Sequence, residues 1–110
     1  MTTHNPDNWV VLKVTSKEDG TVYKVLAGWS GSYMNGSSWQ LNSGIVKVEE
    51  AGNYFLFHGS SGSIYKCHKE QYCLRTNNGG TYNLLKEKYP ARVHLMDEKT
   101  DWMKLIMEKT

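Results

Sequence analysis

The chain has 110 residues and a formal net charge of +2, with 39% hydrophobic and 22% charged residues. This length predicts a single domain, residues 1–110, around one hydrophobic core. Basic residues are spread along the chain, whereas a protein that binds duplex nucleic acid gathers them on one face. No segment is long and apolar enough to span a membrane, and the polar start lacks a secretion signal. We therefore expect a cytoplasmic protein that binds neither duplex nucleic acid nor membrane.

The clearest local signal is a β-hairpin near the N-terminus. Alternating apolar residues over 9–14 predict a strand with one face formed by Val10, Leu12 and Val14. Asp19-Gly20 follows, and this pair favours a hairpin turn. A second strand is then expected over 21–29, with one side formed by Tyr23, Val25, Ala27 and Trp29.

Further strands follow, separated by turns rich in glycine, serine and asparagine. They are expected at 39–49 with a break or bulge at 42–44, at 54–58, which is apolar on both faces like a covered central strand, and at 63–69. Turns are predicted between them at 51–53 and 59–62. The strands together predict a five-stranded antiparallel meander over about residues 9–69.

The last third changes character. Thr81 is expected to cap a short helix that ends before Pro90, and a short strand is expected over 92–96. Thr100 is expected to cap a last helix with an apolar stripe of Trp102, Leu105 and Ile106. Because so short a helix is marginal alone, the stripe must dock on the sheet. The predicted fold is α+β: the meander, then helix-strand-helix packed on the sheet.

The motifs of known catalytic and metal sites are absent from the sequence. It contains no Gly-x-Ser-x-Gly elbow, no phosphate-binding loop and no paired histidines on a helix. Cys67, Cys73, His58 and His68 fall close together, but their spacing fits no zinc pattern. Cys67 and His68 would point to opposite faces of a strand. We expect free thiols, no metal, no cofactor and no catalytic residue; a hydrolase of nucleotide signals is the minor alternative.

One segment, residues 28–39, has a composition suited to binding. Trp29, Tyr33 and Trp39 are interleaved with glycines and serines, and Asn35 adds an amide. Glycine allows a ligand to approach the backbone, and aromatic rings can stack on a nucleobase. The alternative is that Trp29 and Trp39 end neighbouring strands and cap the core, which leaves an ordinary loop.

Two arginines could meet an anion in such a site. Arg75 precedes the stretch Asn77–Gly80, which would lead into a helix N-terminus at Thr81 and offers an anion site on backbone grounds. Arg92 follows the predicted helix, and the planar guanidinium suits phosphate. The candidate ligand-binding residues are therefore Trp29, Tyr33, Asn35, Trp39, Arg75 and Arg92.

Three stretches carry a family resemblance. Residues 23–29, 38–45 and 59–69 resemble small uncharacterised proteins of tailed bacteriophages, over about half the chain. Small accessory phage proteins often block host defences, and one class sequesters cyclic nucleotide signals in symmetric oligomers by aromatic stacking. The resemblance implies a non-enzymatic homo-oligomer in the cytoplasm of an infected bacterial host that holds a small anionic ligand such as a cyclic oligonucleotide. A protein–protein module that inhibits a host enzyme, or a small virion or assembly component, are the alternatives.

Overall fold

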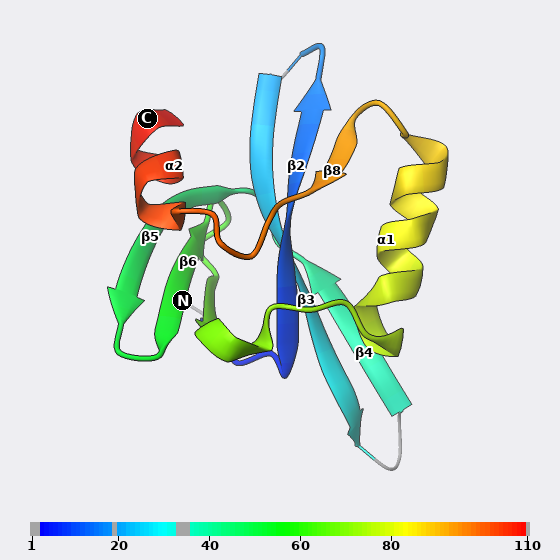
Figure 1. Cartoon of the computed structure of the whole chain (residues 1–110), viewed down its shortest axis with the longest axis vertical. Coiled ribbons are helices and arrows are strands. Elements are labelled where there is room, and N and C mark those ends of the chain that lie inside the picture. The colour runs from blue at the N-terminus through cyan, green and yellow to red at the C-terminus, as the bar shows by residue number, and fades with distance from the viewer. Residues whose placement is uncertain (1–2, 19, 33–35, 110) are drawn as a thin grey trace.

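The computed structural model of the chain describes residues 3–18, 20–32 and 36–109. Over these ranges the chain forms two four-stranded sheets and two short helices, an α+β fold (Figure 1). The antiparallel sheet has the order β4-β3-β2-β8, with bounds Gly36–Leu41, Gly20–Ser32, Asn8–Ser16 and Val93–Leu95. The mixed sheet has the order β1-β7-β6-β5, with bounds Thr3–His4, Ile64–His68, Tyr54–Gly59 and Ile45–Ala51. The helices are α1, Thr76–Lys88, and α2, Trp102–Lys109; a 3₁₀ turn spans Lys69–Gln71.

The predicted hairpin is confirmed. β2 and β3 pair in antiparallel register from Asn8 opposite Gly28 to Ser16 opposite Gly20. Gly20 has φ of +70°, a conformation that side chains with a Cβ rarely adopt. Gly20 is the first residue of β3, and Asp19 of the predicted Asp-Gly turn lies outside the described residues.

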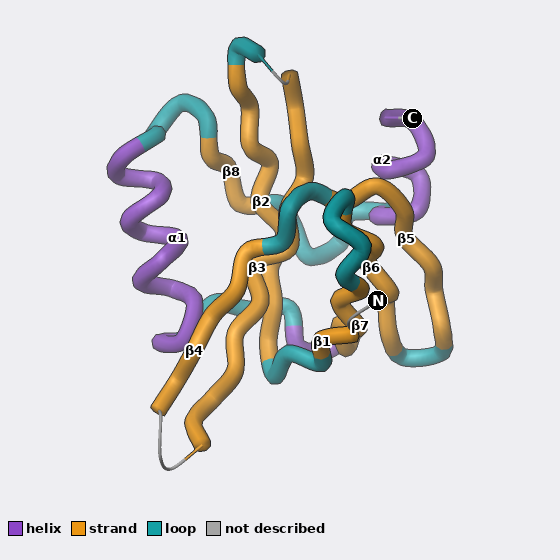
Figure 2. Tube along the Cα trace, turned by 180° about the vertical axis from the view of Figure 1, so that it is seen from behind, coloured by secondary structure: helices purple, strands orange, loops and turns teal. Residues whose placement is uncertain are grey.

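The prediction of a single five-stranded meander is wrong in one respect: the strands are divided between two sheets. The chain leaves the antiparallel sheet after β4 and enters the mixed sheet at β5 (Figure 2). Asn42 ends the pairing with β3: its backbone N–H donates to the Val25 carbonyl, and its Oδ1 accepts from the Val25 N–H at 2.9 Å. Gly44 then turns with φ of +142°, and a Cβ there would lie 2.9 Å from Val22 Cγ1. The break predicted at 42–44 exists, and it is the point at which the chain changes sheet.

The antiparallel sheet lies between α1 and the mixed sheet, so its central strands are covered on both faces. Trp9 and Val11 of β2 face the mixed sheet, while Val10 and Leu12 face α1, and all four are at most 1% exposed. Residues 54–58 were expected to be the strand covered on both sides. In the structure β6 is central in its sheet, but it is fully buried only at Phe57 and Gly59. The doubly covered strands are β2 and β3.

The short strand and the docked last helix predicted for the C-terminal segment are both present in the structure. β8 pairs with β2, and Trp102 and Ile106 of α2 are buried in the core between the sheets. The capping residue differs from the prediction. Asp101 Oδ1 accepts from the Lys104 N–H at 3.1 Å, whereas the Thr100 hydroxyl donates to the Asp97 carbonyl. Asp101, which stands directly before the helix, is therefore its cap.

Helix α1 begins at Thr76, five residues before the predicted start at Thr81. Asn78 explains the early start, because its Oδ1 accepts from the Arg75 N–H at 2.9 Å and from Asn8 Nδ2 at 3.1 Å. Its Nδ2 donates to the Leu26 carbonyl, so the side chain joins the helix start to β2 and β3. These buried bonds offset the poor helix propensity of an Asn-Asn-Gly-Gly stretch.

Tyr72 connects distant segments beneath the 3₁₀ turn. Its hydroxyl accepts from the Val11 N–H at 3.1 Å and donates to the Met96 carbonyl at 2.5 Å. Its ring meets Trp9 edge-on, with centroids 4.7 Å apart. Burial raises the pKa of Tyr72 to about 12. The hydroxyl is thus held in its neutral form by the fold.

The variant Tyr72→Phe is expected to lose about 1–3 kcal/mol at neutral pH, because it leaves a buried N–H and carbonyl without their partner. The folded-state pKa lies above the usual 10, so the neutral hydroxyl contributes its full stability below pH 10 and loses it as pH rises towards 12. The variant should therefore lose less stability than wild type between those pH values. Urea unfolding at neutral and alkaline pH measures both effects. Tyr54→Phe is the control, since among the described residues its hydroxyl has no hydrogen bond; equal alkaline slopes in wild type and Tyr72→Phe would contradict the prediction.

Candidate functional site

Trp29, in the predicted binding segment 28–39, faces the core between the two sheets. Its ring packs against the core between the sheets, and its Nε1 donates to the Asn5 carbonyl at 3.0 Å. His4 meets the ring edge-on, with centroids 6.2 Å apart. The indole therefore fastens the N-terminal segment to β3, in agreement with the capping alternative for this residue.

Trp39 lies on the other face of the same sheet. It pairs with Gly28, whereas Trp29 pairs with Ser38, so the two indoles alternate across the pleat. The Trp39 side chain is 50% exposed. The structure thus does not bring Trp29 and Trp39 together, and Tyr33 and Asn35 fall outside the described residues.

The two arginines lie at opposite ends of α1. Arg75 stands at the position before the helix, where its Nη2 donates to Gln71 Oε1 at 2.9 Å. Arg92 follows the C-terminal end, and its backbone N–H donates to the Tyr89 carbonyl. One compact ligand cannot contact both, since a 13-residue helix spans about 20 Å between them.

The anion site predicted at Asn77–Gly80 assumes a helix start at Thr81, whereas α1 begins at Thr76 and the backbone N–H groups of Asn78 and Gly79 donate to the Arg75 carbonyl. Asn77 and Asn78 are at most 5% exposed and form a buried cluster with Asn8. Asn77 Nδ2 donates to Asn8 Oδ1, and Asn8 Nδ2 donates to Asn78 Oδ1 and to the Cys73 carbonyl. We call Asn8, Asn77 and Asn78 the asparagine cluster; its role is to join α1 to the sheet.

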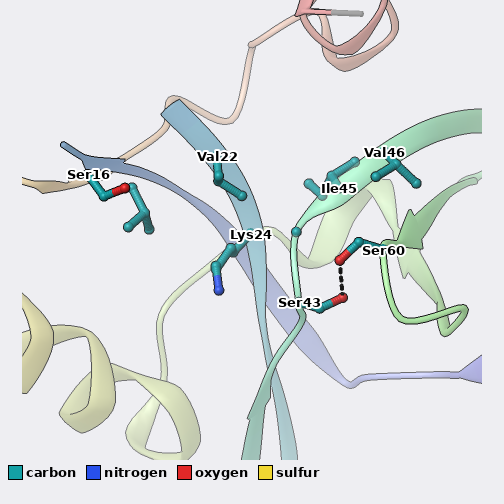
Figure 3. Close-up of a pocket in the computed structure, with 9 residues that line it drawn as sticks. Ser16, Val22, Lys24, Ser43, Ile45, Val46 and Ser60 are labelled. Atoms are coloured by element: carbon teal, nitrogen blue, oxygen red, sulfur yellow. Dashed lines mark hydrogen bonds between the residues drawn. The ribbon is translucent and has the colours of Figure 1, made fainter. Parts of the chain in front are cut away.

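A hollow elsewhere on the same face of the sheet is a better candidate. Two cavities of about 450 and 240 Å³ share Val14, Ser16 and Lys24 and so form one groove beside the β2–β3 hairpin. The larger is further lined by Val22, Ser43, Gly44, Ile45, Val46 and Ser60. Figure 3 shows Ser43, Ser60, Ile45 and Val46 on one side of Lys24. The smaller is further lined by Thr15, Leu41, Leu85, Tyr89, Arg92 and Val93. We call this combined hollow the Lys24 groove.

The groove is positively charged. Lys24 lies where the cavities meet, Arg92 lines the smaller one, and no carboxylate of the described residues lines either. Ser60 Oγ donates to Ser43 Oγ at 2.9 Å, which places two hydroxyls on one wall (Figure 3). Lys88 lies over the Tyr89 ring at 5.6 Å, which adds a further cation near the Arg92 end. Cations beside apolar lining residues suit an anion with an apolar or planar part.

Of the predicted site residues that the structure describes, Arg92 alone lines the groove; the sequence analysis missed Lys24, Tyr89 and the serines. A signal for Lys24 was available. It falls on the opposite face of β3 from Tyr23, Val25 and Ala27, directly across from Leu12, so its ammonium interrupts an otherwise apolar face. Ser43 and Ser60 carried no signal, because their approach depends on how the two sheets meet.

The cysteines and histidines do not assemble a metal site. Among residues 3–18, 20–32 and 36–109, no three His, Cys, Asp or Glu side chains gather as ligands. Cys67 faces the core, where burial raises the pKa of its thiol, while neighbouring His68 accepts from the Glu70 N–H. Cys73 is a partly buried free thiol.

Comparison with known proteins gives no relative to argue from. No family model, curated protein or solved structure matches the chain. In the part of the chain that the structure describes, no helix is long and apolar enough to cross a membrane. The chemistry of the groove is therefore the basis for a functional proposal.

Proposed function

We propose that the chain binds a small anionic ligand in the Lys24 groove and holds it without converting it. The proposal rests on the charge of the groove: Lys24 and Arg92 line it, and no Asp or Glu is among the described lining residues. A bound phosphate would gain charge-assisted hydrogen bonds from both cations.

The shape of the groove supports a ligand with an apolar or aromatic part. The larger cavity, about 450 Å³, falls within the range of small-molecule sites. The smaller one offers Leu41, Leu85 and the Tyr89 ring. A nucleotide combines a phosphate with a planar base and fits this chemistry. With the phage resemblance, this supports the specific proposal of a phage protein that sequesters a cyclic oligonucleotide defence signal in its host's cytoplasm.

A thermal-shift screen with cyclic di- and trinucleotides tests the proposal. Ligand at about 100 times its dissociation constant should stabilise the fold by about 2.7 kcal/mol. Lys24→Ala and Arg92→Ala should each weaken binding about 10- to 100-fold, the loss of one charged hydrogen bond. Chromatography of released ligand should recover it intact, whereas a hydrolase would return a product.

Two matched controls separate the groove from general charge effects. Lys13→Ala removes a lysine from the opposite face of the same hairpin, and Arg75→Ala removes the arginine at the far end of α1. Both should bind like wild type. Tyr33→Ala tests the aromatic segment that lies outside the described residues. A panel without any shift, or equal losses in controls and groove variants, would contradict the proposal.

A further inference from the structure

Three of the four sheet edges have features that prevent pairing with another chain. β1 and β8 have only two and three residues. β5 carries Lys47, Glu49 and Glu50 and has a register shift between Ile45 and Lys47. Short length, charge and bulges are the devices by which proteins block sheet edges.

The fourth edge, β4, is longer than β1 and β8 and lacks charge, and although its pairing with β3 shifts register between Trp29 and Ser32, it is regular from Ser38 to Leu41. It is a six-residue strand, Gly-Ser-Ser-Trp-Gln-Leu, with neither a charged residue nor a proline. Ser38, Trp39 and Gln40 are exposed, and Trp39 is one of the largest exposed apolar side chains of the described residues. An uncharged edge with an exposed indole is a surface that proteins normally avoid unless it is paired.

The backbone of β4 has hydrogen-bonding groups directed to the open side. The Asn42 N–H donates to the Val25 carbonyl across the β3–β4 pair. Because bonded groups alternate along an antiparallel strand, Gln40 and Ser38 also bond to β3, while N–H and C=O groups of Trp39 and Leu41 point away from it. No hydrogen bond between described residues satisfies these outward groups.

We propose that β4 pairs in antiparallel fashion with β4 of a second copy, which joins the two antiparallel sheets into one continuous eight-stranded sheet. An antiparallel edge is self-complementary about a two-fold axis, so each copy supplies and receives the same bonds. A second copy is the occupant that the sequence of β4 favours, because a strand without charge meets its own copy without like-charge repulsion. Trp39, near the middle of the strand, would lose its exposure in the contact. The inference is independent of ligand binding.

Sedimentation velocity of the wild-type protein and two variants, all without ligand, tests the proposed dimer. Trp39→Pro removes an N–H that points away from β3, so it costs no hydrogen bond inside the subunit but blocks one between subunits. Gln40→Lys places like charges on facing copies. We expect a concentration-dependent dimer for wild type, and a dissociation constant at least about tenfold higher for each variant.

Controls keep the test specific. Trp39→Ala retains the N–H and should weaken the dimer less than Trp39→Pro. Val46→Lys adds the same charge to the already blocked edge β5 and should dimerise like wild type. Circular dichroism checks the fold, and if the proline variant unfolds, Gln40→Lys decides. Monomeric wild type at all concentrations, or a folded Gln40→Lys variant that dimerises like wild type, would overturn the proposal.

Discussion

Gly28→Ala is expected to destabilise the fold by about 3 kcal/mol, although it adds a single methyl group. A Cβ at Gly28 would lie 2.2 Å from Asn77 Oδ1 and 2.5 Å from its Cγ, far inside contact distance. Asn77 cannot swing away cheaply, since its Nδ2 donates to Asn8 Oδ1 inside the asparagine cluster. The methyl therefore has to displace the start of α1 or break a buried hydrogen bond.

Urea unfolding of Gly28→Ala measures the cost, and Gly80→Ala provides the matched control. Gly80 lies inside α1, where an added Cβ meets no atom within 4 Å. Alanine there should stabilise the protein by about 0.5–1 kcal/mol, because glycine is the poorer helix former. In the double variant Gly28→Ala/Asn77→Ala the two losses should be less than additive, since the clash is relieved. A stability of Gly28→Ala within error of wild type would show that the cluster does not hold α1 in place.

Trp102→Ala is expected to cost about 3–5 kcal/mol, the usual range for removing a buried tryptophan from a core. Trp102 is 2% exposed and anchors α2 between the sheets. Its ring centroid lies 6.1 Å from those of Trp9 and Phe57 and 5.8 Å from that of Tyr72. Because α2 has only eight residues, it is not stable without this contact.

The Trp102 variant should therefore lose both stability and the amide protection of α2. Hydrogen exchange should show fast exchange over Trp102–Lys109, with the antiparallel sheet still protected. Leu84→Ala is the control, since Leu84 is 66% exposed on α1 and should change stability by less than about 0.5 kcal/mol. Slow exchange across α2 in Trp102→Ala would mean that other contacts hold the helix.

Local patterns predicted the elements well and their assembly poorly. Alternation and the Asp-Gly turn place β2 and β3 correctly, because a hairpin depends on neighbouring residues. The change of sheet at 42–44 depends on Asn42 reaching Val25, a contact that no local pattern contains. The start of α1 was missed for the same reason: Asn78 favours a turn by propensity, and its partners Asn8 and Leu26 lie far away in sequence.

The candidate site shows the same limit. Trp29 and Trp39 were predicted to bind ligand because of their residue type, yet the strand pairing places them on opposite faces of the sheet. The Lys24 groove is assembled from the β2–β3 hairpin, the segment around Ser43, the turn at Ser60 and the end of α1. A site built from four separate segments has no sequence signature. Among the described residues, Arg92 alone is both a predicted ligand-binding residue and a lining residue of the groove.

The order in which the strands join has a consequence for synthesis of the chain. β1 pairs with β7, so Thr3 and His4 can pair only after Ile64 and Tyr65 have been synthesised. Likewise, β2 can pair with its outer neighbour β8 only after Val93–Leu95 has been synthesised. Neither sheet can be completed on the ribosome until most of the chain has emerged. Pairings of such long sequence separation also slow folding, because loop closure precedes their gain. Until then, the uncharged strand β4 stands at an open edge of β2-β3-β4, the first set of hairpin-paired strands to leave the ribosome. Newly made chains would be most prone to associate during that interval.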